Sequence, residues 1–154
     1  MIFLNPDKYQ SKCYERFIFY KSQLKGLLPT ARVEHIGSSS ISGAISKGDL
    51  DIFIGVDACE LDIAIQKLIG IGFQIKQNTL RTPELCMLES LSEDIAFQVV
   101  ANDSEFESFL IFRDRMSADS RLVIQYNEMK RSCQGIAHEE YRNKKSVFIQ
   151  EVLK

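Results

Sequence analysis

The two aspartates Asp49 and Asp51, with one residue between them, are the side chains whose spacing most directly suggests chemistry. Residues 50–56 begin with alternating acidic and apolar residues and continue as an apolar run, the pattern of a buried strand. Side chains two apart on a strand project from one face, with Cα atoms roughly 6.6 Å apart. Such carboxylates can converge on one divalent ion. We predict that Asp49 and Asp51 bind Mg²⁺, which takes one or two carboxylates plus substrate phosphates.

A glycine-serine turn, residues 37–40 (GSSS), lies shortly upstream of the aspartates. Its backbone N–H groups and hydroxyls carry little bulk, so a phosphate can approach closely. We predict phosphate binding by Gly37, Ser38 and Ser39. Lys47, in the connecting loop, could neutralise phosphate charge, although an exposed loop lysine without a role fits equally. An acidic pair alone is often only solvated, but the turn beside it predicts a nucleoside triphosphate held with Mg²⁺.

These residues carry a family resemblance. Residues 36–38 (IGS), a loop and residues 49–52 (DLDI) resemble the signature of the nucleotidyltransferase superfamily. More narrowly, residues 33–43 (VEHIGSSSISG), followed by Lys47 and Asp51, resemble the GrpB family within it. The tail is similar to that family as well, at residues 112–114 (FRD), Tyr126 with Lys130, and residues 141–149. The resemblance implies a mixed sheet with flanking helices and a nucleotide cleft at the glycine-serine turn.

The third carboxylate is the open question. Active nucleotidyltransferases generally place another acid on a later strand, where it binds metal or acts as general base. Here that strand is residues 95–100 (IAFQVV), and GrpB members tend to show histidines where this chain has Ala96 and Gln98. Asp94 precedes the strand on the same face by period-two alternation, so it is either the third catalytic acid or a solvated turn residue. Gln98 can only hydrogen-bond, because a neutral amide is a poor base.

Four further side chains are candidates for the lining of the cleft. His35 adjoins the turn and either contacts a phosphate or is a hydrogen-bonded structural histidine. Gln98 is a candidate through its strand. Tyr141 and Lys145 lie four apart and share a helical face. The resemblance places them at the cleft, and the alternative is a packed tyrosine beside a lysine whose stem is buried and whose ammonium reaches water.

Hydrophobic periodicity predicts the elements that position these residues. The pattern indicates α+β: a helix, a mostly β middle with an embedded helix, and a helical C-terminal half, in one domain over residues 1–154. Asn5 and Pro6 predict a helix start, and Asn102 with Glu105 predicts a capping pair before a later helix. The expected strands are 33–36, 50–56, 73–76, 85–88 and 95–100, and helix 61–68 lies between them. With so short a chain, the helices from Phe106 onward must form any second wall of the cleft.

Composition narrows the partners. The net charge of −2 argues against long nucleic acids and acidic membranes, because phosphate-backbone affinity needs clustered basic residues. The densest basic cluster is interleaved with acids, which favours a solvated helix face; it comprises Lys130, Arg131, Arg142, Lys144 and Lys145. No stretch reaches membrane-spanning length, no basic N-terminal signal is present, and the four scattered cysteines favour neither a zinc cluster nor a disulfide framework. A cytoplasmic location is the expectation.

Two functions follow from the resemblance and the residues together. The first is an enzyme that transfers a nucleoside monophosphate from a nucleoside triphosphate to a small-molecule acceptor with Mg²⁺. The alternative is a non-catalytic nucleotide or phosphometabolite binding protein with a degenerate active site. The sequence leaves the acceptor, the nucleotide and the oligomeric state open.

Overall fold

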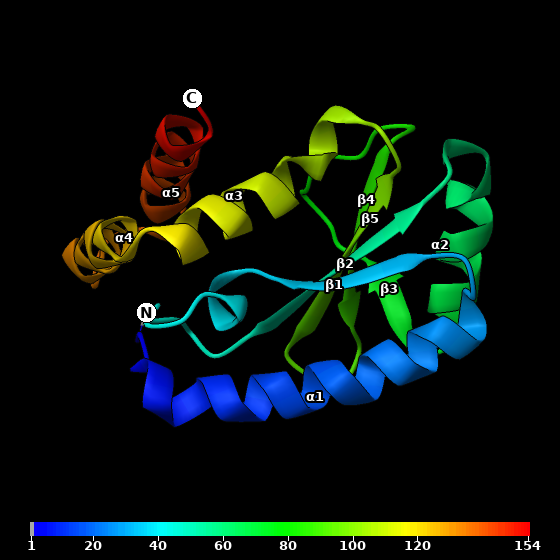
Figure 1. Cartoon of the computed structure of the whole chain (residues 1–154), viewed down its shortest axis with the longest axis horizontal. Coiled ribbons are helices and arrows are strands. Elements are labelled where there is room, and N and C mark those ends of the chain that lie inside the picture. Colours follow the sequence, from blue (N-terminus) through cyan, green and yellow to red (C-terminus); the bar gives the residue numbers. More distant parts are fainter. Residues whose placement is uncertain (1) are drawn as a thin grey trace.

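The computed structural model describes residues 2–154 and contains a five-stranded mixed sheet (Figure 1). The strand order is β1-β2-β5-β4-β3. The central pair β2 and β5 is parallel, and each other neighbouring pair is antiparallel. The strands are β1 (Arg32–Ile36), β2 (Leu50–Val56), β3 (Phe73–Ile75), β4 (Leu85–Ser90) and β5 (Ile95–Ala101).

Helices flank this sheet and make up the C-terminal half of the chain. The α-helices are α1 (Pro6–Leu27), α2 (Leu61–Gly70), α3 (Ser108–Ala118), α4 (Ser120–Ser132) and α5 (His138–Leu153). Three short 3₁₀ helices are η1 (Ser38–Ser40), η2 (Ala58–Glu60) and η3 (Glu105–Glu107). The predicted α+β class, with a mixed sheet and a helical C-terminal half, is confirmed. Met1 lies outside the described residues, and the single domain over 1–154 stays a prediction.

The predicted capping pair of Asn102 and Glu105 is wrong. Helix α3 begins later, at Ser108, and Asn102 is engaged elsewhere. Its Nδ2 donates to Asp57 at 2.9 Å, and its Oδ1 accepts from Arg32 Nε at 3.2 Å. The side chain therefore joins the ends of β1, β2 and β5 instead of capping a helix, because tertiary partners satisfy it better than the local backbone.

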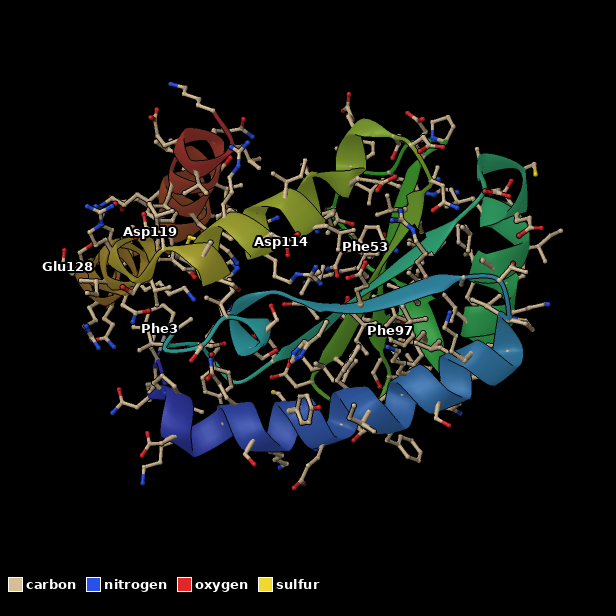
Figure 2. All side chains as sticks on the ribbon, viewed as in Figure 1. Phe3, Phe53, Phe97, Asp114, Asp119 and Glu128 are labelled. Carbon is tan, nitrogen blue, oxygen red and sulfur yellow. The ribbon has the colours of Figure 1, made fainter. Side chains whose placement is uncertain are left out.

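The two faces of the sheet have different roles. One face packs against α1 and α2, and Phe97 lies on this side (Figure 2). The opposite face is covered by the first part of α3, with Phe53 beneath it (Figure 2). Asp51 lies on the same face as Phe53 because the two residues are two apart on β2. Gln98, on the neighbouring strand β5, pairs with Phe53 and so lies on that face as well. The two polar residues therefore lie close together on the face of the sheet that α3 covers in part.

Helices α4 and α5 lie beyond one end of the sheet, on the side away from α2 (Figure 1). They pack around Met116, Val123 and Tyr126, and they hold the loop that links the glycine-serine turn to Asp49. The Asn127 side chain accepts a hydrogen bond from Ile45 N and donates one to Gly43 O, both at 2.9 Å. Residues from the two halves of the chain thus fix this loop.

Among residues 2–154, no helix combines the length and the apolar character needed to cross a membrane.

Candidate functional site

A cavity of about 320 Å³ opens on the face of the sheet that carries Asp51 and Gln98. Its walls come from the glycine-serine turn, the loop and strand that carry the aspartates, the turn after β3, the N-terminal segment and helices α3 to α5. The prediction that the helices from Phe106 onward form the second wall is confirmed. Predicted site residues in the wall are Gly37, Ser38, Lys47, Asp49, Asp51, Gln98, Tyr141 and Lys145.

Asp51 and Gly37 fit against each other at the base of the cavity. Gly37 has φ of +75°, a left-handed backbone that favours glycine, and a Cβ there would overlap the Asp51 carboxylate. Burial and the nearby Asp49 charge raise the pKa of Asp51 to about 7. Asp49 accepts a hydrogen bond from Ser46 Oγ at 3.3 Å. Burial and the Asp49 charge disfavour ionisation of Asp51, and a cation beside the two carboxylates would offset this effect.

Lys130 enters the cavity from α4 and is buried, with 2% of the residue exposed. Its ammonium donates to Ser38 Oγ at 2.5 Å and to Ile45 O at 2.6 Å. It also lies over the Tyr126 ring, 4.2 Å from the centroid. Burial, with the charge of Lys145 second, lowers the pKa of Lys130 to about 7. A lysine anchored on the glycine-serine turn adds a cation at the position where a phosphate was predicted.

The cavity carries more positive than negative charge. It is lined by two carboxylates, Asp49 and Asp51, and by five cationic side chains, so the surplus is three. None of the seven takes part in the ion pairs formed among residues 2–154. The cations are Lys47, Lys76, Lys130, Arg142 and Lys145. Unneutralised cations that converge on a cavity favour an anionic ligand.

His35 and Ser39 lie outside the cavity wall. The His35 ring stacks on Phe17 with centroids 4.9 Å apart, and its Nε2 hydrogen-bonds Ser39 Oγ at 2.7 Å. Burial, with the Arg113 charge second, lowers the pKa of His35 to about 4. Of the two interpretations of His35, the structure supports the hydrogen-bonded structural histidine. The same geometry turns Ser39 towards the sheet core, where it contributes to the turn and not to the cavity.

Asp94 is exposed and does not line the cavity. Its carbonyl pairs with Leu50 N, which sets it opposite Asp49 at the start of the two parallel strands. Burial and the Asp49 charge raise the pKa of Asp94. Gln98 lies in the wall with Asp51. The place on β5 next to the two aspartates is therefore held by a neutral amide.

Three cavity residues, Lys130, Lys76 and Arg142, were not predicted as site residues from the sequence. The interpretation of Lys130 as part of a solvated helix face is wrong, because its side chain turns inward from α4. A signal was available: Lys130 follows Tyr126 and Asn127 by four and three positions, so all three share one helical face. Lys76 follows β3, and nothing local connects that turn with the aspartates.

The residues present fit a single Mg²⁺. Among residues 2–154, no three His, Cys, Asp or Glu side chains cluster to hold a metal ion. Magnesium does not require such a cage, since one or two carboxylates with phosphate oxygens and water complete its shell. Asp49 and Asp51 would hold it, and the bound ion would neutralise phosphate charge. The Gln98 Oε1 atom is buried without a hydrogen-bond partner, which is consistent with a missing ligand at this position.

Comparison with known proteins decides the family. The family model described as GrpB protein matches residues 6–154. The chain belongs to the GrpB family. A UPF0157 protein of Vibrio cholerae is 55% identical over 154 residues, covering 99% of this chain and 82% of the relative. A UPF0157 protein of Deinococcus radiodurans is 27% identical over 158 residues, covering 99% and 81%.

Solved structures place this GrpB chain in a wider fold group. The crystal structure of GrpB from Enterococcus faecalis matches with a TM-score of 0.82 and 21% identity, covering 99% of this chain and 94% of that one. The Cid1 poly(U) polymerase with MgGTP bound matches with a TM-score of 0.59 and 20% identity, covering 83% of this chain and 43% of Cid1. At these identities the likeness shows the fold, which is nucleotidyltransferase-like.

Proposed function

We propose that this GrpB chain binds a nucleoside triphosphate together with Mg²⁺ in the cavity at the glycine-serine turn. The observation that carries the proposal is the set of five unpaired cations around two unpaired carboxylates in one cavity. A triphosphate with Mg²⁺ would supply a partner to both sets, because its phosphates are anions for the five cationic side chains and the Mg²⁺ is a cation for the aspartates. The fold shared with a polymerase whose structure holds MgGTP supports the same ligand class.

Each wall has a role in this proposal. The backbone at Gly37, the Ser38 hydroxyl and the Lys130 ammonium would hold phosphates, with Lys145 and Lys47 as further cations. Another part of the cavity is apolar or aromatic and suits the sugar and base, which carry little charge. That part is lined by Phe3, Phe109, Phe112, Tyr126, Tyr141 and Ile149. Phe3, on the N-terminal segment, meets the Tyr141 ring of α5 edge to face with centroids 5.7 Å apart, and Figure 2 shows it beside helix α4.

Binding is the first candidate and nucleotidyl transfer the second. In transfer, an acceptor oxygen would attack the α-phosphorus, pyrophosphate would leave, and a base would take the acceptor proton. Asp94 favours this candidate because it lies opposite Asp49 and shares its electrostatic field. Gln98 favours binding without turnover, because an amide occupies the place of a third acid and cannot accept that proton.

The test of binding is a thermal-shift titration of the four nucleoside triphosphates with and without Mg²⁺. A ligand that binds only the folded state raises Tm by mass action. We expect a Mg²⁺-dependent rise with at least one triphosphate, lost in Asp51→Ala and reduced in Lys130→Met. Lys12→Met, at an exposed position on α1, is the matched control and should keep the full rise. If no triphosphate produces a rise that depends on Mg²⁺ and Asp51, the proposal is wrong.

The test of transfer is pyrophosphate release in the presence of the bound triphosphate and a set of small alcohols and phosphate esters. Asp94→Asn separates the candidates, since it changes charge with almost no change in shape. Release that falls in Asp94→Asn while triphosphate affinity stays constant supports transfer. Release that is absent, or equal in the two proteins, removes Asp94 as the base.

A further inference from the structure

The turn after β3 forms a second cationic edge of the cavity, apart from the lysines on α4 and α5. Lys76, Gln77 and Thr79 all line the cavity. Asn78 adopts a left-handed backbone with φ of 60°, and Thr79 Oγ1 donates to Lys76 O at 2.8 Å. These two features close the turn locally.

Sheet register places this edge next to the aspartates. Lys76 N bonds to Met87 O, Met87 pairs with Gln98, and Gln98 pairs with Phe53. Lys76 therefore lies at the end of a row that crosses β4, β5 and β2 on the face that carries Asp51. The Lys76 side chain is exposed and lines the cavity together with Asp51.

The charges in the cavity indicate that a bound triphosphate would not neutralise all of its cationic side chains. A nucleoside triphosphate with one Mg²⁺ brings a net charge of roughly −2, against a surplus of three positive charges in the cavity. Lys130, on Ser38, and Lys145 supply the phosphate side. Lys76, on the other side of the aspartates, forms no ion pair within residues 2–154.

The buried Gln98 Oε1 atom, between Lys76 and the lysines of α4 and α5, requires a hydrogen-bond donor. It is an acceptor without a donor, it belongs to the cavity wall, and it lies in the same cross-strand row as Lys76. A buried amide oxygen of this kind is satisfied by a hydroxyl or by water, and not by an anion.

We infer that the cavity holds a second small molecule beside the nucleotide, an anionic alcohol whose phosphate or carboxylate binds Lys76 and whose hydroxyl donates to Gln98. The inference depends on the proposed function for the position of the nucleotide, and it defines the chemical class of its co-ligand. In a transferase this molecule would be the acceptor, with its hydroxyl beside the aspartates. In a binding protein it would be a second ligand of a ternary complex.

The experiment is calorimetric titration of glycerol 3-phosphate, and separately of glycerate, into protein saturated with Mg²⁺ and a non-hydrolysable triphosphate analogue. We expect at least one of them to bind, with affinity lowered about tenfold in Lys76→Gln, the loss of one charge-assisted contact. The wild-type protein should bind neutral glycerol no more tightly than the Lys76→Gln variant binds glycerol 3-phosphate or glycerate. Lys12→Gln is the control for loss of a lysine outside the cavity and should bind normally.

Three results would overturn the inference: no binding of either anion, equal binding in Lys76→Gln, or displacement of the nucleotide by the anion. Gln98→Leu adds an independent readout, because it should weaken the hydroxylated anions while leaving inorganic phosphate unchanged. If no triphosphate binds at all, the proposed function fails separately. The same titrations into free protein then still decide whether Lys76 and Gln98 form an anionic-alcohol site.

Discussion

Replacement of Lys130 by methionine should leave the stability of the protein almost unchanged near neutral pH and lower it at high pH. Burial lowers the pKa of this lysine from 10.5 to about 7. Between these pH values the unfolded chain binds the proton and the folded chain releases it, so stability rises with pH across this window. At 1.36 kcal/mol per pKa unit, the buried charge costs about 4 kcal/mol at pH 7 and less than about 1 kcal/mol at pH 10.

Methionine removes this cost and also removes favourable contacts. Two hydrogen bonds, to Ser38 Oγ and Ile45 O, contribute about 1 kcal/mol each, and Ile45 O is left without a donor at a cost of about 1–3 kcal/mol. The net result for Lys130→Met is close to zero at pH 7 and a loss of about 3 kcal/mol at pH 10. This dependence on pH identifies the charge as the cause, because packing defects do not titrate.

The assay is urea denaturation of both proteins at pH 7 and pH 10, with Lys12→Met as the exposed control, for which we expect no difference between the two pH values. A stability difference for Lys130→Met that is the same at both pH values would refute the reasoning. The same variant should bind a triphosphate more weakly at pH 7, where its stability should be close to that of the wild type.

Three further substitutions test the base of the site and the structural histidine. Gly37→Ala should lower the free energy of unfolding, measured by urea denaturation, by about 2 kcal/mol, because φ at this position is +75° and the added Cβ would meet Asp51. Gly26→Ala is the control, since a Cβ there meets nothing within 4 Å, and it should cause no loss of stability. Asp51→Asn should be more stable than the wild type at pH 9 but not at pH 4, since the raised pKa of Asp51 gives stability that is lost as pH rises through about 7. His35→Gln should remove a loss of stability that the wild type shows as pH falls from 6.5 to about 4, which chemical denaturation across that range measures.

The elements that the sequence predicted correctly are those whose pattern is local. Residues 50–56 were predicted as a strand from their own apolar run, and β2 has these bounds. The other strands differ from their predicted limits by one or two residues, as expected where ladders end. Asn102 shows the limit of such reasoning, since its partners Asp57 and Arg32 are distant in sequence and overrode a local capping pattern.

The same distinction applies to the site. Gly37, Ser38, Asp49 and Asp51 fall within one short segment, and their types and spacing were enough to place them together. Lys130 lies 92 residues from the serine it contacts, and only packing of α4 against the loop brings them together. Helical spacing could have placed Lys130 on the buried face with Tyr126, but it could not have identified Ser38 as its partner.

The charges around the two aspartates argue for a ligand more strongly than the count of acids argues for or against catalysis. In the proposed site, a third carboxylate beside Asp51 would favour metal binding without nucleotide, whereas with Gln98 in that place a Mg²⁺ ion would depend on phosphate oxygens and water for its remaining ligands. The buried Lys130 has the same dependence, because an anion beside it would raise its lowered pKa and lead to proton uptake. Metal, nucleotide and proton binding at this site should therefore be cooperative. Such coupling requires no turnover, which is why binding is the first candidate and transfer the second.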